Sequence, residues 1–292
     1  MNHAKNKVEL ALQRSDKLGE CPVWDEESQS LYWVDSRAPT LYRLTGAQLS
    51  WWSMPETVGS FGLCRSGGLI LALQRGLYAF DLKTADVKML AQPEADRPTN
   101  RFNDGRCDRR GRFWAGTMSD VSREPSGSLY RLHPDGSCFR MFGDIIVPNS
   151  ICWSPDSRIM YFADTYQQCI WAFDFTLETG AICNRRVFRD THGHPGKPDG
   201  SAVDSDACLW NCEYGGRRIV RYDPSGEIDR VIPVPAANPT CCAFGGGDLR
   251  TLFVTSATQR LTPQQLAEQP LAGSVFAIQT EVGGLPEARF GG

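Results

Sequence analysis

Several features that commonly reveal a protein's location or partners are missing from this chain of 292 residues. No apolar run is long enough to cross a bilayer, and the start of the chain leads into no apolar segment of the kind that a signal peptide needs. There is no excess of positive charge, because 31 Lys and Arg stand against 34 Asp and Glu, a formal net charge of −3. Nucleic-acid binders carry a basic stripe. We therefore expect a cytoplasmic protein that binds neither membranes nor nucleic acid.

The sequence also lacks the short motifs that announce common kinds of catalysis. It contains no Gly-x-Ser-x-Gly nucleophile elbow, no Walker A loop, no His-Glu-x-x-His zinc motif and no EF-hand loop. His192 and His194 lie close together in a loop rich in Gly and Pro, where they could ligate a metal or form a lid. A solvent-exposed surface loop is the preferred interpretation of that stretch.

Paired cysteine motifs are absent although the chain has 11 cysteines. The number is odd, the spacing is irregular, and no Cys-x-x-Cys occurs. Zinc sites built from cysteine need paired spacing, and disulfide frameworks usually have an even count. We predict that the cysteines are free thiols, most of them buried as small apolar side chains.

Helical periodicity is nearly absent, and only residues 263–268 suggest one or two helical turns. In its place, six segments repeat a pattern of short apolar runs separated by polar turns. The starts of their middle runs lie about 40 to 50 residues apart, which is the period of propeller blades. These middle runs are residues 31–34 (LYWV), 69–72 (LILA), 113–116 (FWAG), 160–163 (MYFA), 209–212 (LWNC) and 252–255 (LFVT).

Six repeats of about four strands predict an all-β protein, a closed six-bladed β-propeller that spans residues 1–292 as a single domain. Closure is favoured because it leaves no exposed sheet edges. Residues 8–12 are expected to add a strand to the blade that the C-terminal end completes. A β-sandwich or two smaller β domains are the alternatives, but neither readily explains the regular period.

One position near the start of each repeat is polar in all six copies. The first strand of a blade lines the propeller axis, so side chains at this position are expected to converge there. Asn or Asp before Gly or Ser is also an ordinary turn residue. Its recurrence in every repeat favours a functional site instead. The six residues at this position are Glu20, Ser60, Asn103, Asn149, Asp199 and Thr240.

Three of these residues offer oxygen ligands: the carboxylates of Glu20 and Asp199 and the amide of Asn149. Two neighbouring carboxylates repel each other, and a divalent cation removes that penalty. An all-oxygen set that waters complete suits Ca²⁺, Mg²⁺ or Mn²⁺. We expect one divalent cation, Ca²⁺ by preference, with Zn²⁺, Mn²⁺, Mg²⁺ and Fe²⁺ as alternatives.

Seven short motifs are spread over nearly the whole chain. They are residues 18–24 (LGECPVW), 100–105 (NRFNDG), 116–118 (GTM), 148–150 (PNS), 198–200 (PDG), 251–256 (TLFVTS) and 271–276 (LAGSVF). In these motifs the chain resembles the family of senescence marker protein-30, gluconolactonase and luciferin-regenerating enzyme. The resemblance implies a six-bladed propeller with a divalent cation in its channel. It places the metal ligands at Glu20, Asn149 and Asp199, and the sugar contacts at Arg101 and Asn103.

Two positions depart from the family pattern. Cys21 stands where the family usually has glycine, which crowds the loop after Glu20. After Met118, the calcium-binding regulators of the family carry an acidic pair that includes a substrate contact, whereas this chain has Ser-Asp-Val with Asp120 in the middle. The resemblance to the family therefore implies least about which sugar lactone this chain accepts. Asp120 and Asp104 are candidates for a supporting role around the metal.

These observations predict a metal-dependent hydrolase that opens a small sugar lactone, an aldonolactone such as glucono-, xylono-, arabino- or galactonolactone. Asp199 would serve as metal ligand and general base, with Asp104 as the reserve base, while Arg101 and Asn103 orient the sugar. The alternatives are a calcium-binding regulatory protein of the regucalcin type, a related hydrolase of phosphotriesters or other lactones, and a non-catalytic scaffold. We expect a monomer or a small homo-oligomer.

Overall fold

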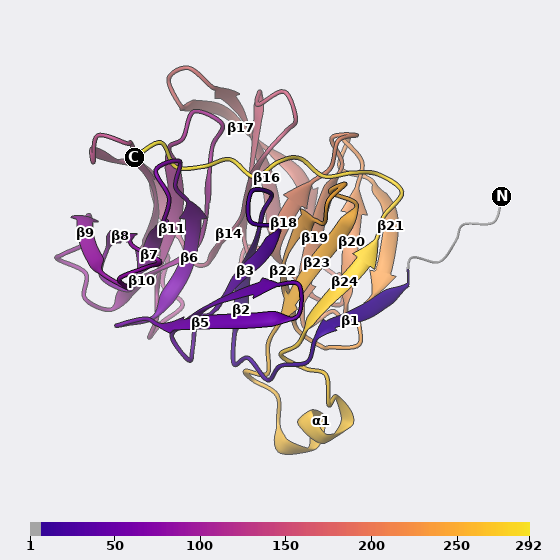
Figure 1. The fold of residues 1–292 in the computed structure, drawn as a ribbon. Coiled ribbons are helices and arrows are strands. Elements are labelled where there is room, and N and C mark those ends of the chain that lie inside the picture. Colours follow the sequence, from indigo (N-terminus) through magenta and orange to yellow (C-terminus); the bar gives the residue numbers. More distant parts are fainter. Residues whose placement is uncertain (1–6) are drawn as a thin grey trace.

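The structure is a computed structural model that describes residues 7–292, and these residues form six four-stranded antiparallel sheets. The sheets follow one another around a central axis as the blades of a propeller (Figure 1). The innermost strand of each blade contacts the innermost strand of the next, and the last of these contacts the first, so the ring is closed. The predicted all-β, six-bladed β-propeller is confirmed.

Each blade is a meander whose strands run outward from the axis in chain order, except where the ring closes. The innermost strands are β2 (Gly19–Asp25), β6 (Val58–Leu63), β10 (Asn100–Cys107), β14 (Pro148–Trp153), β18 (Lys197–Val203) and β22 (Pro239–Gly245). The second strands are β3 (Ser30–Asp35), β7 (Leu69–Leu73), β11 (Phe113–Ser119), β15 (Ile159–Asp164), β19 (Leu209–Tyr214) and β23 (Thr251–Ser256). The third strands are β4 (Thr40–Thr45), β8 (Leu77–Phe80), β12 (Gly127–Leu132), β16 (Cys169–Thr176), β20 (Arg218–Tyr222) and β24 (Val275–Gln279). The outermost strands are β5 (Gln48–Ser53), β9 (Val87–Ala91), β13 (Cys138–Ile145), β17 (Ala181–Asp190), β21 (Ile228–Pro233) and β1 (Val8–Leu12).

The two ends of the chain share the sixth blade. β1 pairs antiparallel with β24, so the N-terminal strand forms the outer edge of the sheet that β22, β23 and β24 begin. This confirms the strand predicted for residues 8–12. The prediction of one domain over residues 1–292 also includes residues 1–6, which lie outside the described part of the chain.

The apolar core is divided into six clusters, one between each pair of neighbouring blades. Trp33 of the first blade packs with Val275 of the sixth, and Trp114 of the third blade packs with Phe162 of the fourth. The inner strands are therefore buried on both faces. This explains why the middle run of each repeat reads as continuous apolar residues rather than as an alternating pattern.

Every innermost strand is interrupted by a register shift close to its start. The shift follows Glu20 in β2, Asn149 in β14 and Pro198 in β18. A β-bulge inserts an extra residue and turns the local side chains away from the regular pleat. The repeated polar position therefore coincides with a repeated bulge that faces the axis.

Different segments of the chain lie at the two ends of the propeller axis. The helix α1 (Pro263–Glu268), which confirms the predicted short helical segment, projects from one end (Figure 1). At the other end the chain that follows β24 crosses the propeller as an extended segment (Figure 1). There Glu287 Oε1 lies 3.1 Å from Arg106 Nε of β10, and Phe290 packs between the second and third blades.

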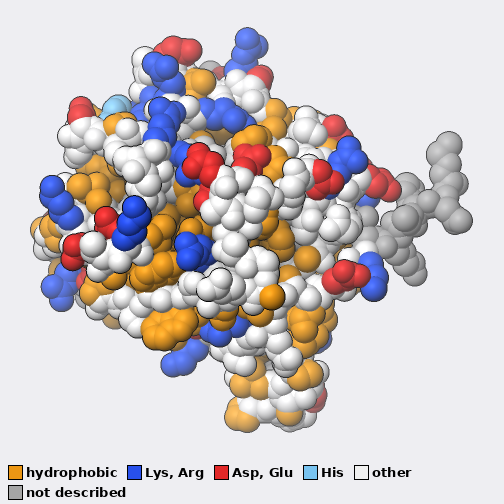
Figure 2. Space-filling view, in the orientation of Figure 1, with side chains coloured by type: hydrophobic (Ala, Val, Ile, Leu, Met, Phe, Trp, Pro, Cys, Tyr) orange, Lys and Arg blue, Asp and Glu red, His pale blue; other side chains and the backbone are white. Residues whose placement is uncertain are grey.

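The molecular surface carries charges of both signs. Figure 2 shows acidic and basic side chains interspersed over one face of the molecule, with apolar surface between them. No helix among residues 7–292 is long and apolar enough to cross a membrane.

All eleven cysteines are free thiols in the structure, as predicted, and Cys183 is the one that is exposed. Burial raises the pKa of Cys64 to about 12 and that of Cys169 to about 11, which keeps these thiols protonated and unreactive. We expect a thiol-reactive dye to modify Cys183 first in the native protein, and all eleven cysteines under denaturing, non-reducing conditions. The substitution Cys183→Ser should remove this first, fast reaction with the dye. A denatured count that is lower by whole pairs would contradict the prediction.

Candidate active site

A cavity of about 450 Å³ opens at the end of the axis where α1 lies. Gln259 and Arg260, which precede the helix, form part of its wall. The volume is within the range that small-molecule sites occupy. Six of the seven predicted site residues line this cavity, and they are Glu20, Arg101, Asn103, Asp120, Asn149 and Asp199.

Glu20 and Asp199 place two carboxylates on the cavity wall, from the first and fifth blades. Burial raises the pKa of Glu20 well above its usual value, and the negative charges of Asp199 and Asp104 raise it further. Burial followed by the charge of Asp104 likewise raises the pKa of Asp199. No side chain among residues 7–292 donates a hydrogen bond to either carboxylate, and backbone hydrogen bonds at Cys21 and Gly200 only partly lower the two pKa values. The negative charges of these two carboxylates are therefore only partly offset by neighbouring protein groups.

The amide of Asn149 completes this group, and its orientation is determined by a hydroxyl. The hydroxyl of Thr165 donates to the backbone carbonyl of Pro198 (2.8 Å), so it accepts from Asn149 Nδ2 (2.7 Å). Because the nitrogen is held on that side, Oδ1 of Asn149 is directed away from Thr165 and accepts from Asn103 Nδ2 at 3.2 Å. Thr165 was not predicted from the sequence as a site residue, although it directly follows a buried strand.

Arg101 and Asp120 form a second charged group on the wall. Arg101 Nε donates to Asp120 Oδ1 at 2.8 Å, and the guanidinium of Arg37 binds the same carboxylate through both terminal nitrogens. The hydrogen bond from Arg37 is the largest of the effects that hold the pKa of Asp120 well below its usual range. Arg101 is 3% exposed, and its Nη2 group makes no hydrogen bond within residues 7–292. That group is free to bind a ligand.

Asn103 connects the two groups. Its Oδ1 accepts from Arg101 Nη1 at 2.8 Å, while Nδ2 donates to the Pro148 carbonyl at 2.9 Å and to Asn149 Oδ1. Both amide hydrogens are therefore used within the protein. Asn103 thus positions Arg101 and Asn149, and because it also lines the cavity, the sugar contact predicted for it from the sequence stays a prediction.

Asp104 is the one predicted site residue that does not line the cavity. Its Oδ1 accepts from the Gly105 amide and its Oδ2 from the Ile151 amide of the next blade, both at 2.9 Å. Asn103 and Asp104 are neighbours in a bulge, so their side chains leave the strand in different directions. Asp104 remains close enough to raise the pKa of Asp199.

Two of the six equivalent positions do not contribute to the cavity either. Thr240 is fully buried, and its hydroxyl donates to the Gly19 carbonyl at 2.5 Å, which links the sixth blade to the first. Ser60 is buried as well. The Thr240 hydroxyl is held by the Gly19 carbonyl, whereas the Ser60 hydroxyl has no hydrogen-bond partner within residues 7–292. Neither residue lines the cavity.

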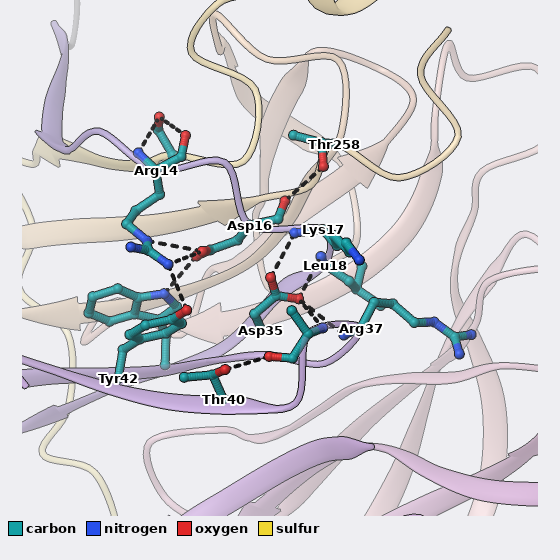
Figure 3. Close-up of polar contacts among 12 residues, drawn as sticks. Arg14, Asp16, Lys17, Leu18, Asp35, Arg37, Thr40, Tyr42 and Thr258 are labelled. Carbon is teal, nitrogen blue, oxygen red and sulfur yellow. Dashed lines mark hydrogen bonds and ion pairs between the residues drawn. The ribbon is translucent and has the colours of Figure 1, made fainter. Parts of the chain in front are cut away.

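Acidic residues at the ends of second strands hold the loops that carry the site. Asp35 accepts from four backbone amides, those of Lys17 (2.8 Å), Leu18 (3.1 Å), Arg37 (3.0 Å) and Ala38 (3.0 Å) (Figure 3). Leu18 and Arg37 both line the cavity. One carboxylate thus joins the loop before β2 to the loop after β3.

The fourth blade repeats this arrangement. Asp164 accepts from the backbone amides of Ile146 (2.8 Å), Val147 (3.1 Å) and Tyr166 (3.2 Å), and Val147 and Tyr166 line the cavity. In both repeats an aspartate, Asp35 or Asp164, directly follows the middle apolar run. This pattern in the sequence could have identified both loops.

Strained backbone occurs directly beside two of the polar positions. Cys21 has φ of 49° and Ser150 has φ of 58°, in the left-handed region that favours glycine. They follow Glu20 and Asn149. The glycine that the resemblance implies at the position of Cys21 would relieve this strain, because a side chain there costs backbone energy of roughly 1–2 kcal/mol. Such outliers tend to accompany functional sites.

The loop with two histidines is split between surface and cavity. His192 is exposed, and its Nδ1 lies 2.6 Å from Asp190 Oδ1. His194 lines the cavity, and its Nδ1 lies 2.7 Å from Glu213 Oε1. The loop therefore forms part of the wall, while its tip faces solvent.

The donor set fits a hard divalent cation. Two carboxylates without side-chain donors and one oriented amide oxygen come from three different blades to one cavity, and these are ligands that Ca²⁺ and Mg²⁺ prefer. A cation there would offset the burial and the charge repulsion that raise both carboxyl pKa values. No group of three or more His, Cys, Asp or Glu side chains suited to a metal occurs within residues 7–292, as expected when an amide is the third ligand.

Comparisons with known proteins cover nearly the whole chain. A family model described as the SMP-30/gluconolactonase/LRE-like region matches residues 18–258. The chain is 38% identical to a 6-deoxy-6-sulfogluconolactonase of Pseudomonas putida, with 98% of this chain and 99% of the relative covered. It is 39% identical to an L-arabinolactonase of Azospirillum brasilense over 99% and 97% of the two chains. The crystal structure of regucalcin from Agrobacterium tumefaciens, described as a calcium-binding protein, superposes with a TM-score of 0.94 at 30% identity, covering 98% of this chain and 97% of that one.

Proposed function

This chain belongs to the SMP-30/gluconolactonase/LRE-like family, and from that membership and the geometry of the cavity we propose that it is a metal-dependent sugar lactonase. It would open an aldonolactone, such as glucono-, xylono-, arabino- or galactonolactone, to the aldonic acid. The observation that carries the proposal is the convergence of Glu20, Asn149 and Asp199 on one cavity beside Arg101. Two relatives that align along almost their entire length are named as sugar lactonases.

Glu20, Asn149 and Asp199 would hold one divalent cation. Three oxygen ligands favour the hard cations Ca²⁺, Mg²⁺ and Mn²⁺ over Zn²⁺ and Fe²⁺. Among these we prefer Ca²⁺, because the similar regucalcin structure is described as a calcium-binding protein. When bound, such a cation supplies a Lewis acid that polarises the lactone carbonyl and stabilises negative charge on its oxygen. Asp199 accepts a proton from the water that attacks the carbonyl carbon. The bond between the carbonyl carbon and the ring oxygen then breaks, and the ring oxygen takes the proton from Asp199 and leaves as a hydroxyl of the aldonic acid.

Arg101 orients the sugar through the free Nη2 group, since its other nitrogens are held by Asp120, Asn103 and the backbone. A donor that is already fixed loses little entropy when it binds, which favours a single pose of the ester. Asp120 holds Arg101 and Arg37 in place. Asp104 affects the site through its charge, because both of its oxygens are bound to backbone amides.

The eleven free cysteines support a cytoplasmic location, because thiols persist in reducing compartments. We place the enzyme there as a monomer or small homo-oligomer whose partner is a small-molecule sugar lactone.

The test is acid release from a panel of sugar lactones, followed at constant pH with spontaneous hydrolysis subtracted. Each lactone is measured with added Ca²⁺, with other divalent cations, and with excess chelator. Metal-dependent acid release above the spontaneous rate is the expected result. A protein that binds Ca²⁺ but hydrolyses no lactone would be a calcium-binding regulator, and one that hydrolyses only phosphotriesters would be a different hydrolase.

Arg101→Ala should chiefly raise KM. A buried, charge-assisted contact to substrate is worth about 1.5–3 kcal/mol, which corresponds to roughly 10- to 100-fold in kcat/KM. Arg110→Ala removes an exposed arginine at the other end of the axis and should leave both constants unchanged. A fall in kcat at constant KM would contradict the role of Arg101 in binding.

A further inference from the structure

Three positively charged side chains surround one tyrosine ring on the cavity wall. The guanidinium carbon of Arg123 lies 4.4 Å from the centroid of the Tyr166 ring, and Nζ of Lys197 lies 4.0 Å from it. Arg260 Nη1 donates to the Tyr166 hydroxyl at 3.0 Å. All four residues line the cavity, and they come from segments of four different blades. We call them the Tyr166 cluster.

The charges of this cluster have no acidic partners. Among residues 7–292, neither Arg123, Lys197 nor Arg260 forms an ion pair. The other arginines on the same wall, Arg101 and Arg37, are both paired with Asp120. Like charges gathered around one ring repel each other, so the arrangement becomes favourable when an anion joins it.

The three cations also affect the pKa of the Tyr166 hydroxyl. Burial would raise the pKa of Tyr166, yet the hydrogen bond from Arg260 and the charges of Arg260, Arg123 and Lys197 lower it on balance. A net positive potential therefore extends over this part of the wall. The carboxylates of Glu20 and Asp199 do not neutralise it, because they are the ligands assigned to the divalent cation.

The cluster is close to the reacting groups. Tyr166 directly follows Thr165, whose hydroxyl holds Asn149 at 2.7 Å. Lys197 precedes Asp199 by two residues in β18, so their Cα atoms are about 7 Å apart, and both side chains line the cavity. A sugar whose ester lies at Asp199 would extend its far end toward the Tyr166 cluster.

We propose that the Tyr166 cluster binds an anionic group on the substrate, so that the preferred lactone carries an oxyanion at the end remote from its ester. This inference rests on the proposed lactonase function and names the substrate class for the same site. Sulfonate, phosphate and carboxylate share the required chemistry, namely several acceptor oxygens on one charged group. Arg123 and Arg260 offer forked N–H donors to such a group, and Lys197 offers a point charge.

The test compares kcat/KM for gluconolactone with that for gluconolactone bearing a phosphate, a sulfonate or a carboxylate on its last carbon. The wild-type protein should prefer at least one charged lactone by about tenfold or more, since charge-assisted hydrogen bonds exceed neutral ones by that order. Raising the ionic strength from about 0.01 M to about 1 M shortens the Debye length roughly tenfold and should reduce the preference. Comparison of the three charged lactones shows whether the cluster prefers a phosphate, a sulfonate or a carboxylate.

Lys197→Met and Arg260→Gln, alone and combined, should lower the ratio of kcat/KM for charged over neutral lactone, the double variant by about tenfold or more. The ratio is the readout because a general loss of folding or metal would lower both values together. Arg158→Gln is the matched control, since Arg158 is 85% exposed in the turn between β14 and β15 and does not line the cavity. Its ratio should equal that of the wild type.

An equal or higher kcat/KM for the neutral lactone, with a ratio that Lys197→Met and Arg260→Gln do not change, would overturn the proposal while the lactonase function stands. If no lactone is hydrolysed, the function fails, and the cluster is then tested by binding alone. Gluconate and its terminal phosphate, titrated calorimetrically into the metal-loaded protein, should differ in affinity by about tenfold in favour of the phosphate. Equal affinities would overturn the proposal in that case.

Discussion

Asp199→Asn is expected to reduce kcat for a reactive sugar lactone by about 10²–10⁴, the usual contribution of general acid–base catalysis. The substitution keeps the shape of the side chain and one oxygen that can bind the cation, but it removes the group that accepts a proton. Metal affinity should weaken less than turnover. Steady-state hydrolysis, corrected for the spontaneous reaction and with metal occupancy measured in each variant, gives the comparison.

The control for this variant is Asp206→Asn, which neutralises an exposed carboxylate in the turn that follows the same strand, β18. Its kcat should match the wild type. If fully metal-loaded Asp199→Asn keeps a kcat near the wild-type value, then Asp199 is only a ligand. Asp104 would be the next candidate base, although the structure binds both of its oxygens to backbone amides.

Removal of the divalent cation is expected to bring lactone hydrolysis down to the spontaneous rate while the β-propeller remains folded. The six apolar clusters between the blades contain neither Glu20 nor Asn149 nor Asp199, so the core does not depend on the ion. Dialysis against a chelator, elemental analysis, circular dichroism and activity after adding back Ca²⁺, Mg²⁺, Mn²⁺ or Zn²⁺ measure these effects.

The melting temperature should fall modestly on chelation, because a ligand that binds the folded state stabilises it by mass action. Glu20→Gln supplies an independent check. It removes one of the two buried charges, so it should weaken metal binding and leave the apo protein at least as stable as the wild type. Full activity in protein that elemental analysis shows to be free of metal would refute the metal-dependent mechanism.

Much of the architecture could be predicted from the sequence because the signals are local and repeated. Continuous apolar runs such as Leu31 to Val34 mark strands that neighbouring blades bury on both faces. Their period indicates blades, and six blades indicate closure. The polar position at Glu20, Asn149 and Asp199 was recognisable for the same reason, since one feature recurred at the same place in each repeat.

Several properties of the site were decided only by the tertiary structure. A bulge in β10 separates the directions of Asn103 and Asp104, and a displacement by one residue reverses which side chain reaches the cavity. Ser60 and Thr240 occupy the same position in the repeat as Asp199 but are buried outside the cavity wall. The repeat pattern carries no information about such single-residue shifts.

By itself, the sequence determined the propeller and its number of blades, because a strand pattern that recurs six times along the chain predicts both. It also predicted that Glu20, Asn149 and Asp199 share one site, since they occupy the same position in their repeats. Only the closed ring decided that Arg123, Lys197 and Arg260 meet around Tyr166, and that Thr165 orients Asn149. These contacts join blades that are far apart in the sequence. Their existence depends on how each loop bends over the axis, and hydrogen bonds such as those of Asp35 and Asp164 determine that path across the whole ring.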